Sequence, residues 1–179
     1  MQTYIAILRG INVGGKKIIK MTDLVKLFDN LGYFNIRTYI QSGNVIFEAD
    51  DDKYLIHGYL EQSIMETFGF EVPLILISKN ELQELIDKNP FIKNTISEID
   101  NLHATFLNTF PDALNIKGLE TIDFSPDKFM IIDKCLYLKC SGKYSDSKLT
   151  NTFIEKKLKV RATTRNWKTV MKLIELTDI

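Results

Sequence analysis

The first 79 residues alternate between short runs of β-branched and aromatic residues and stretches in which apolar residues recur at helical spacing. The runs are typical of buried strands, and the helical spacing is typical of helices that bury one face. We expect strands at residues 3–8, 36–40, 45–47 and 72–77, and helices around residues 24–31 and 56–68. The predicted order is therefore β-α-β-β-α-β.

Short polar segments between these elements indicate where each begins and ends. Thr22 is the expected N-cap of the first helix, and Gly32 and Gly69 are the expected stop signals of the two helices. Residues 42–44, with the sequence Ser-Gly-Asn, lie between two strands and predict a β-hairpin turn.

The second half of the chain repeats this order less clearly. Strands are expected at 103–107, 129–132, 135–139 and near Val160, and helices around 82–86, 112–120, 149–158 and 167–174. Asn80 and Gln83 are expected to form a capping box at the first of these helices, and residues 89–101 form a connector. The sequence thus predicts an α+β fold of two tandem ferredoxin-like (βαββαβ) subdomains, 1–79 and 80–179, together one compact unit.

The composition is that of a globular protein. Of the 179 residues, 45% are hydrophobic, which suffices for one ordinary core or two small ones packed together. The N-terminal segment has no basic stretch before its apolar run, and no stretch approaches the roughly 18 apolar residues of a membrane span, so a cytoplasmic location is expected. Cys135 and Cys140 should point to opposite faces of one strand, so we expect reduced, unpaired thiols.

Charge is balanced overall but unevenly distributed. The 23 basic and 23 acidic residues give a net charge of zero, which argues against a protein coated in positive charge for bulk nucleic-acid binding. No acid precedes Asp23, and the segment before it carries four cations, which are Arg9, Lys16, Lys17 and Lys20. A second acid-free stretch, residues 156–174, contains seven basic residues. Both ends of the chain are therefore expected to be positively charged.

The segment LRGINVGGKK, residues 8–17, is the main candidate for binding chemistry. Gly10, Gly15 and Lys16 have the spacing of the phosphate-binding pattern G-x-x-x-x-G-K-[ST], but Lys17 replaces the hydroxyl residue and the helix begins several residues too late. What remains is a loop whose glycines let backbone amides approach an anion while nearby cations supply charge. A glycine-rich surface loop with solubilising lysines explains the same residues.

The predicted topology places this loop beside the turn at residues 42–44. The first and second strands should run parallel, so the segments that follow them should lie at the same end of the sheet. The candidate ligand contacts in the two segments are Arg9, Gly10, Asn12, Gly14, Gly15, Lys16, Ser42, Gly43 and Asn44. In an enzyme the cations would stabilise negative charge and the polar side chains would orient the ligand, but no general base is evident.

A second basic segment precedes the last expected helix. Thr163 or Thr164 is the expected N-cap, which would place Arg165 and Lys168 in the first helical turn, where cations oppose the helix dipole. An anion bound to the free amides and to the Arg165 guanidinium would explain this placement. An ion pair between Arg165 and an acid elsewhere in the fold would explain it as well.

The sequence does not support metal or cofactor chemistry. His57 and His103 are the two histidines, and neither has a cysteine, histidine or acid at metal-ligand spacing, so no metal and no cofactor is expected. The strand expected near residues 44–48 also lacks the aromatic-rich motif with which RNA-recognition modules stack bases.

Several blocks of sequence carry a resemblance to a known family. LRGINVGGKK, TYIQSGNVIF, SKLTNTFIEKKL and TTRNWKTVMKL closely resemble the bacterial family catalogued as domain of unknown function 1697. The resemblance spans nearly the whole chain and implies two tandem α/β subdomains, with no established activity. The family's signature blocks fall on the stretches already singled out, at Arg9, Gly10, Asn12, Gly14 and Gly15, at Ser42, Gly43 and Asn44, and at Arg165, Asn166 and Trp167, so Arg165 and Asn166 are also candidate ligand contacts. Lys17 and Ile18 depart from the asparagine and polar residue of the family, which makes Lys17 the weakest candidate contact.

Three hypotheses of function follow. The first is binding of a small anionic ligand, a nucleotide or phosphorylated metabolite, through the glycine-rich loop and the turn at Ser42. The second is sequence-tolerant nucleic-acid binding by the basic terminal segments. The third is a protein-interaction module that uses exposed strand edges. The sequence predicts no membrane association, and it decides neither whether the protein is an enzyme nor its oligomeric state.

Overall fold

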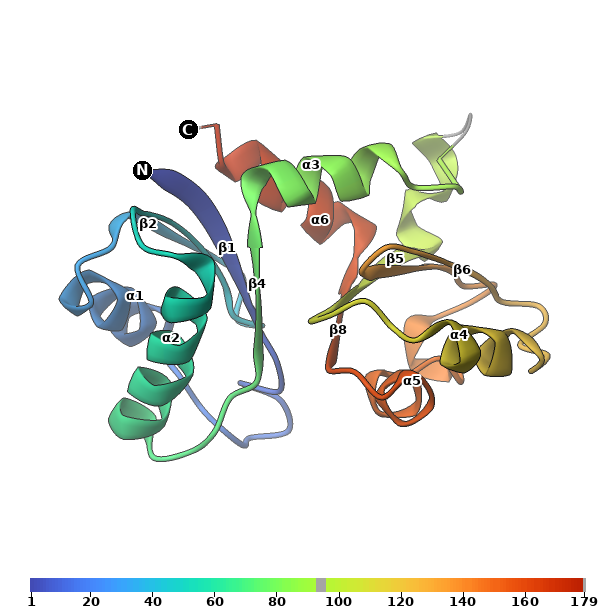
Figure 1. The fold of residues 1–179 in the computed structure, drawn as a ribbon, viewed down its shortest axis with the longest axis horizontal. Coiled ribbons are helices and arrows are strands. Elements are labelled where there is room, and N and C mark those ends of the chain that lie inside the picture. The colour runs from blue at the N-terminus through green and yellow to red at the C-terminus, as the bar shows by residue number, and fades with distance from the viewer. Residues whose placement is uncertain (93–95, 179) are drawn as a thin grey trace. The chain divides into compact units, whose positions relative to one another are not determined.

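The computed structural model describes residues 1–92 and 96–178, and the chain divides into two units (Figure 1). The first unit comprises Met1–Gln83 and Leu173–Ile179, and the second comprises Glu84–Lys172. Each unit contains one four-stranded antiparallel sheet with helices, so the fold is of the mixed α and β class. The division expected from the sequence, between residues 79 and 80, falls within helix α3 (Lys79–Asp87), and the chain also leaves the first unit within this helix.

The first unit follows the predicted order of elements. Its strands are β1 (Gln2–Leu8), β2 (Phe34–Tyr39), β3 (Asn44–Ala49) and β4 (Leu74–Ser78), and its main helices are α1 (Met21–Asn30) and α2 (Lys53–Phe68). The strands lie in the order β2-β3-β1-β4, and every neighbouring pair is antiparallel. Because β1 and β2 both pair antiparallel with β3, they run in the same direction, and their following loops emerge at the same end.

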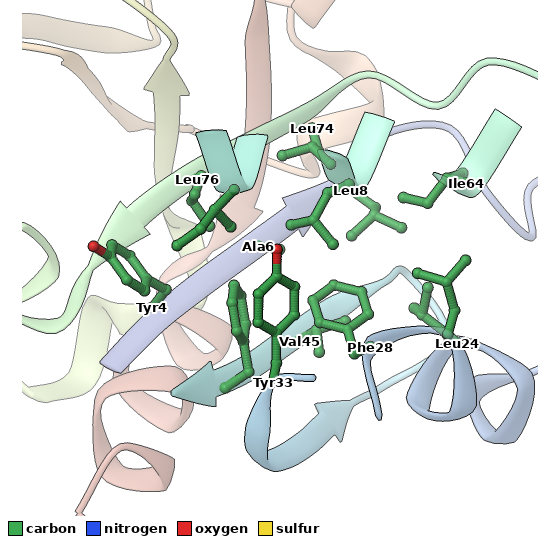
Figure 2. Close-up of a cluster of buried hydrophobic side chains, with 14 of the residues drawn as sticks. Tyr4, Ala6, Leu8, Leu24, Phe28, Tyr33, Val45, Ile64, Leu74 and Leu76 are labelled. Atoms are coloured by element: carbon green, nitrogen blue, oxygen red, sulfur yellow. The ribbon is translucent and has the colours of Figure 1, made fainter. Parts of the chain in front are cut away.

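The core of the first unit lies between one face of this sheet and helices α1 and α2. Alternate residues of β1, among them Ala6 and Leu8, meet Phe28 of α1 and Ile64 of α2, as Figure 2 shows. The rings of Phe28 and Phe47 pack edge to face with centroids 5.0 Å apart. Burying each such side chain contributes roughly 1.5 to 3 kcal/mol, so this apolar face fixes the positions of both helices.

The caps of the helices differ in part from the sequence expectations. Helix α1 has Lys20 at its N-cap without a side-chain bond, so the expected capping role of Thr22, which lies inside the helix, was wrong. The side chain of Asp52 caps α2 by accepting a hydrogen bond from the Tyr54 amide. Gly69 ends α2 in a left-handed conformation with φ of 78°, as predicted.

The capping box of α3 is formed by other residues than expected. The Ser78 amide donates to Glu81 Oε2 at 2.7 Å, and the Glu81 amide donates back to Ser78 Oγ at 3.2 Å. The pair expected from the sequence, Asn80 and Gln83, was therefore wrong. Ser78 is also the last residue of β4, so strand and helix join without a loop.

The second unit repeats the same strand order, β6-β7-β5-β8, again with antiparallel pairs. Its elements are the strands β5 (Leu102–Leu107), β6 (Lys128–Ile132), β7 (Cys135–Lys139) and β8 (Ala162–Asn166), the helices α4 (Ala113–Glu120), α5 (Asn151–Leu158) and the start of α6 (Trp167–Leu176), and two short 3₁₀ helices, η1 (Ile96–Asn101) and η2 (Tyr144–Asp146). The strands expected at 129–132 and 135–139 are confirmed and pair as a hairpin through residues 133–134, whereas the strand expected near Val160 begins at Ala162. Cys135 and Cys140 are both buried and unpaired, as predicted.

Candidate functional site

The glycine-rich segment forms a small β-hairpin, and we call residues 10–20 the glycine hairpin. Val13 and Lys16 form an isolated antiparallel bridge, closed by a hydrogen bond of 3.1 Å from the Lys16 amide to the Val13 carbonyl. Gly14 and Gly15 lie between them with φ of 59° and 72°. Two consecutive positive φ angles are what a tight two-residue turn requires, so these glycines are explained by backbone geometry.

Asn12 holds the glycine hairpin against the turn between β2 and β3. Its Nδ2 donates to the Ile19 carbonyl at 2.9 Å and to the Gln41 carbonyl at 2.8 Å. Its Oδ1 accepts a hydrogen bond of 2.9 Å from the Ile19 amide. Both amide hydrogens of Asn12 and its carbonyl oxygen are therefore engaged inside the protein. The predicted proximity of the two segments is confirmed, and Asn12 serves it as a structural residue.

Gly43 is buried in the turn after β2, which we call the Ser42 turn (residues 40–43). Its carbonyl accepts a hydrogen bond of 2.8 Å from the Leu8 amide, and its φ is 77°. A Cβ atom at Gly43 would lie 2.6 Å from Ile11 Cδ1 and 2.9 Å from Leu8 Cβ. Glycine is therefore needed here because the chain that enters the glycine hairpin passes directly over it.

Asn44, the first residue of β3, is completely buried. Its Nδ2 donates to the Tyr39 carbonyl at 3.0 Å and to Ser42 Oγ at 3.2 Å, so its side chain closes the Ser42 turn from within. Ser42 is half-buried. Of these two predicted contacts, Ser42 is the one that remains partly accessible to solvent.

The cations of the segment have different surroundings. Lys16 and Lys20 are exposed, and Arg9 is half-buried. Lys17 bends back onto the protein: its amine donates to the Glu71 carbonyl at 2.6 Å and lies 5.9 Å from the centre of the Phe70 ring. The Lys17 side chain therefore has partners within the protein.

The segment before α6 differs from the sequence expectation. Thr163 and Thr164 lie in β8, and Asn166 caps α6 by accepting a hydrogen bond of 2.8 Å from the Thr169 amide, so the expected threonine cap was wrong. Arg165 also lies in the strand, so the expectation that it occupies the first helical turn and opposes the helix dipole was wrong. Burial lowers the pKa of Arg165 to about 10, which leaves its guanidinium protonated at neutral pH.

Three other cations near the C-terminus have structural surroundings. Lys168, in the first turn of α6, forms an ion pair with Asp100. Lys156 and Lys157 occupy the last turn of α5, where the helix dipole favours positive charge. Arg165 and Asn166 belong to the second unit, whereas the glycine hairpin and the Ser42 turn belong to the first.

Sequence spacing did not reveal a histidine–cysteine contact in the second unit. His103 Nδ1 lies 3.9 Å from Cys140 Sγ, and the His103 ring stacks on Tyr144 with centroids 4.9 Å apart. Burial, helped by the charge of Asp127, raises the pKa of Cys140 to about 11, and burial lowers the pKa of His103. The pair therefore consists of a neutral thiol and a neutral imidazole at pH 7, unlike an activated nucleophile.

Metal ligation and membrane-spanning helices can be assessed for the described part of the chain. Within residues 1–92 and 96–178, no cluster of three or more histidine, cysteine or acidic side chains is arranged to hold a metal ion. None of the helices in the described part of the chain is both long enough and apolar enough to cross a membrane.

Comparison with known proteins identifies a family but no activity. No curated protein matches the chain. A solved structure of a conserved bacterial protein, SP0830 from Streptococcus pneumoniae, shares the fold with a TM-score of 0.75 at 22% sequence identity, over 98% of each chain. The family model described as "Protein of unknown function (DUF1697)" matches residues 1–137. The chain therefore belongs to the DUF1697 family.

Proposed function

We propose that the protein binds a small anionic ligand, a nucleotide or phosphorylated metabolite, at the glycine hairpin. One observation carries this proposal: Asn12 fixes the hairpin beside the Ser42 turn, while Lys16 and Lys20 stay exposed in a segment with no acid before Asp23. A fixed pair of loops with exposed cations attracts an anion at a small cost in conformational entropy.

We propose two roles among the predicted contacts. Gly10, Gly14, Gly15 and Lys16 are exposed and are proposed to face the ligand through backbone amides and charge. Asn12, Gly43 and Asn44 are used inside the fold, and we propose that they shape the site without touching the ligand. Arg165 and Asn166 take no part in this proposal.

Nucleic-acid binding by the basic terminal segments is the second candidate. It has less support, because Lys168 is paired with Asp100 and Arg165 is half-buried within its strand. The two candidates differ in salt dependence. Several phosphate contacts would make log affinity fall steeply with log salt concentration, whereas one small anion would give a shallow slope.

The proposal is tested by thermal unfolding with inorganic pyrophosphate and with ATP as probes. Bound at a hundred times its dissociation constant, a ligand stabilises the folded state by about 2.7 kcal/mol, which corresponds to a rise in Tm of roughly 5 to 11 °C for a chain of this size. We expect this rise for the wild type and its loss in Lys16→Ala. Lys143→Ala, at an exposed lysine of the second unit, is the matched control and should respond like the wild type.

Three results would contradict anion binding at the hairpin. The first is an unchanged Tm of the wild type with both probes, and the second is an equal response of Lys16→Ala and Lys143→Ala. The third is a response to DNA alone that disappears steeply with salt, which would favour the nucleic-acid candidate. Arg9→Ala is less informative than Lys16→Ala, because Arg9 is half-buried and its removal is expected to affect folding too.

We further propose that both units are ferredoxin-like and that the protein is cytoplasmic. The orders β2-β3-β1-β4 and β6-β7-β5-β8, each with one helix after the first strand and one after the third, support the first point. The two free cysteines support a reducing compartment.

A further inference from the structure

The outer face of helix α2 is unusually apolar for a surface helix. Its inner face carries Ile56, Leu60 and Ile64, which are buried in the core of the first unit. Its other face exposes four large apolar residues, which are Tyr54 (87% exposed), Leu55 (55%), Tyr59 (54%) and Met65 (45%). Polar residues such as His57, Glu61 and Ser63 lie between the two faces, and large apolar side chains exposed on the outer face are typical of an interaction surface.

Gly58 lies within this outer face, one helical turn from Leu55 and next to Tyr59. It is exposed, and a Cβ built on it would meet no atom within 4 Å. Glycine weakens the interior of a helix, and nothing within the described chain packs closely enough on Gly58 to require it. A missing side chain in the middle of an apolar stripe is what permits a second helix to approach closely.

We infer that the outer face of α2 is a homodimer interface, in which α2 packs antiparallel on α2 of a second copy. In this arrangement a two-fold axis passes near Tyr59, and the same apolar residues of α2 line the interface from each copy, so apolar surface meets apolar surface. Gly58 of each copy leaves room for the Tyr59 and Gln62 side chains of the other.

The charges at the two ends of α2 favour an antiparallel second copy. Asp51 and Asp52 are exposed at the N-terminal end. Near the other end, the bond from Lys17 to the Glu71 carbonyl brings the glycine hairpin, with Lys16, close to the helix C-terminus. An antiparallel pair therefore sets the acidic end of one copy against the basic hairpin of the other.

Acids at the C-terminal end do not reverse this pattern. Glu66 and Glu71 lie there. The Arg9 amide donates to the Pro73 carbonyl, two residues beyond Glu71, and Lys17 donates to the Glu71 carbonyl. The three cations Arg9, Lys16 and Lys17 therefore outnumber the two acids at this end. A parallel pair would instead bring two acidic ends together, which would be unfavourable.

The size of the face sets the expected strength. A helix of 16 residues is about 24 Å long, so a helix pair alone buries less than the roughly 800 Å² per partner of a standard stable interface. We therefore expect a reversible dimer with a dissociation constant on the order of micromolar rather than nanomolar.

Sedimentation of the full chain between about 1 μM and 1 mM tests the inference. The wild type, with a monomer mass of 20.7 kDa, should approach twice that mass as concentration rises. Gly58→Gln should weaken association at least about tenfold, because it fills the point of closest approach. Gly118→Gln in α4 is the matched control, because Gly118 is also helical and exposed with no atom within 4 Å of a built Cβ.

Both glutamine variants replace glycine within a helix, so each should fold at least as well as the wild type. A wild type that stays monomeric at about 1 mM overturns the inference, and so does equal association of the two variants. Salt of about 1 M should weaken the dimer, because it screens the opposed charges, and stronger association in salt would overturn the antiparallel charge matching. At about 1 μM or below, where both proteins are monomeric, Gly58→Gln should respond to pyrophosphate like the wild type, which separates this test from that of ligand binding.

Discussion

Replacing Asn12 by alanine should destabilise the protein, because the Asn12 side chain connects two loops. The change removes three hydrogen bonds, two to Ile19 and one to Gln41. At about 0.5 to 1.5 kcal/mol each, these contribute roughly 1.5 to 4.5 kcal/mol to stability. Asn12 also has a φ of 55°, a conformation that alanine adopts at a cost of about 1 to 2 kcal/mol.

Solvent replaces part of the lost bonding, because the site is partly exposed, so we expect a net loss of about 2 to 4 kcal/mol. Urea unfolding followed by circular dichroism measures this loss as a lower midpoint at an unchanged m value. Asn12→Gly is the matched control, because it removes the same bonds without the left-handed strain and should be milder by about 1 kcal/mol.

Asn12→Asp offers an isosteric check of the same reasoning. It keeps an acceptor for the Ile19 amide but turns a carboxylate oxygen towards the carbonyls of Ile19 and Gln41. We expect it to be at least as destabilising as Asn12→Gly at neutral pH. If all three variants lowered the free energy of unfolding by less than about 0.5 kcal/mol, the structural role of Asn12 would be refuted, and Asn12 would again be a candidate ligand contact.

Further predictions concern the turns, the cap of α6 and the buried histidine. Gly43→Ala places a Cβ 2.6 Å from the nearest side-chain carbon, so it should lower the free energy of unfolding by about 2 to 4 kcal/mol. Gly14→Ala has open space around it and should lower the free energy of unfolding by about 1 kcal/mol. Similar losses of stability for the two variants in urea unfolding would contradict the turn geometry. Asn166→Ala should lower the free energy of unfolding by about 1 kcal/mol through the lost cap, and an unchanged midpoint would argue against that role. Burial lowers the pKa of His103 below 6.5, so the unfolded state binds a proton first as pH falls. The free energy of unfolding should therefore decrease below about pH 6.5. His103→Gln should make the free energy of unfolding depend less on pH than in the wild type.

The order of helices and strands was predictable because each element of the core has a clear apolar period. The strand β1 is a continuous β-branched and aromatic run, and α1 shows Leu24, Leu27 and Phe28 at helical spacing. The proximity of the glycine hairpin and the Ser42 turn followed from chain direction alone, because β1 and β2 run parallel.

The junctions from strand to helix were less predictable. β4 and β8 each run into a helix without a loop, and the last strand residue, Ser78 or Asn166, is also the N-cap. Apolar periodicity does not mark such a junction, and two threonines before Asn166 suit a strand as well as a cap. The motif Ser78-x-x-Glu81 was present in the sequence and could have located the first junction.

The roles of the candidate site residues depended on tertiary contacts. Asn12 and Asn44 were correctly placed beside a pair of turns, but their side chains bond across the fold, and no local pattern predicts that use. The glycine spacing that resembles a phosphate-binding loop arises from separate backbone requirements, since Gly10, Gly14 and Gly15 each have a positive φ. Sequence spacing alone does not distinguish glycines that the backbone conformation requires from glycines that bind a phosphate.

Amide hydrogen exchange at Ile19 tests most directly whether the glycine hairpin is a fixed structure held by Asn12. The Ile19 amide donates to Asn12 Oδ1 at 2.9 Å, so it should exchange at least about 30-fold more slowly in the wild type than in Asn12→Ala, which corresponds to about 2 kcal/mol of opening free energy. Equal exchange rates at Ile19 in the two proteins would contradict the account.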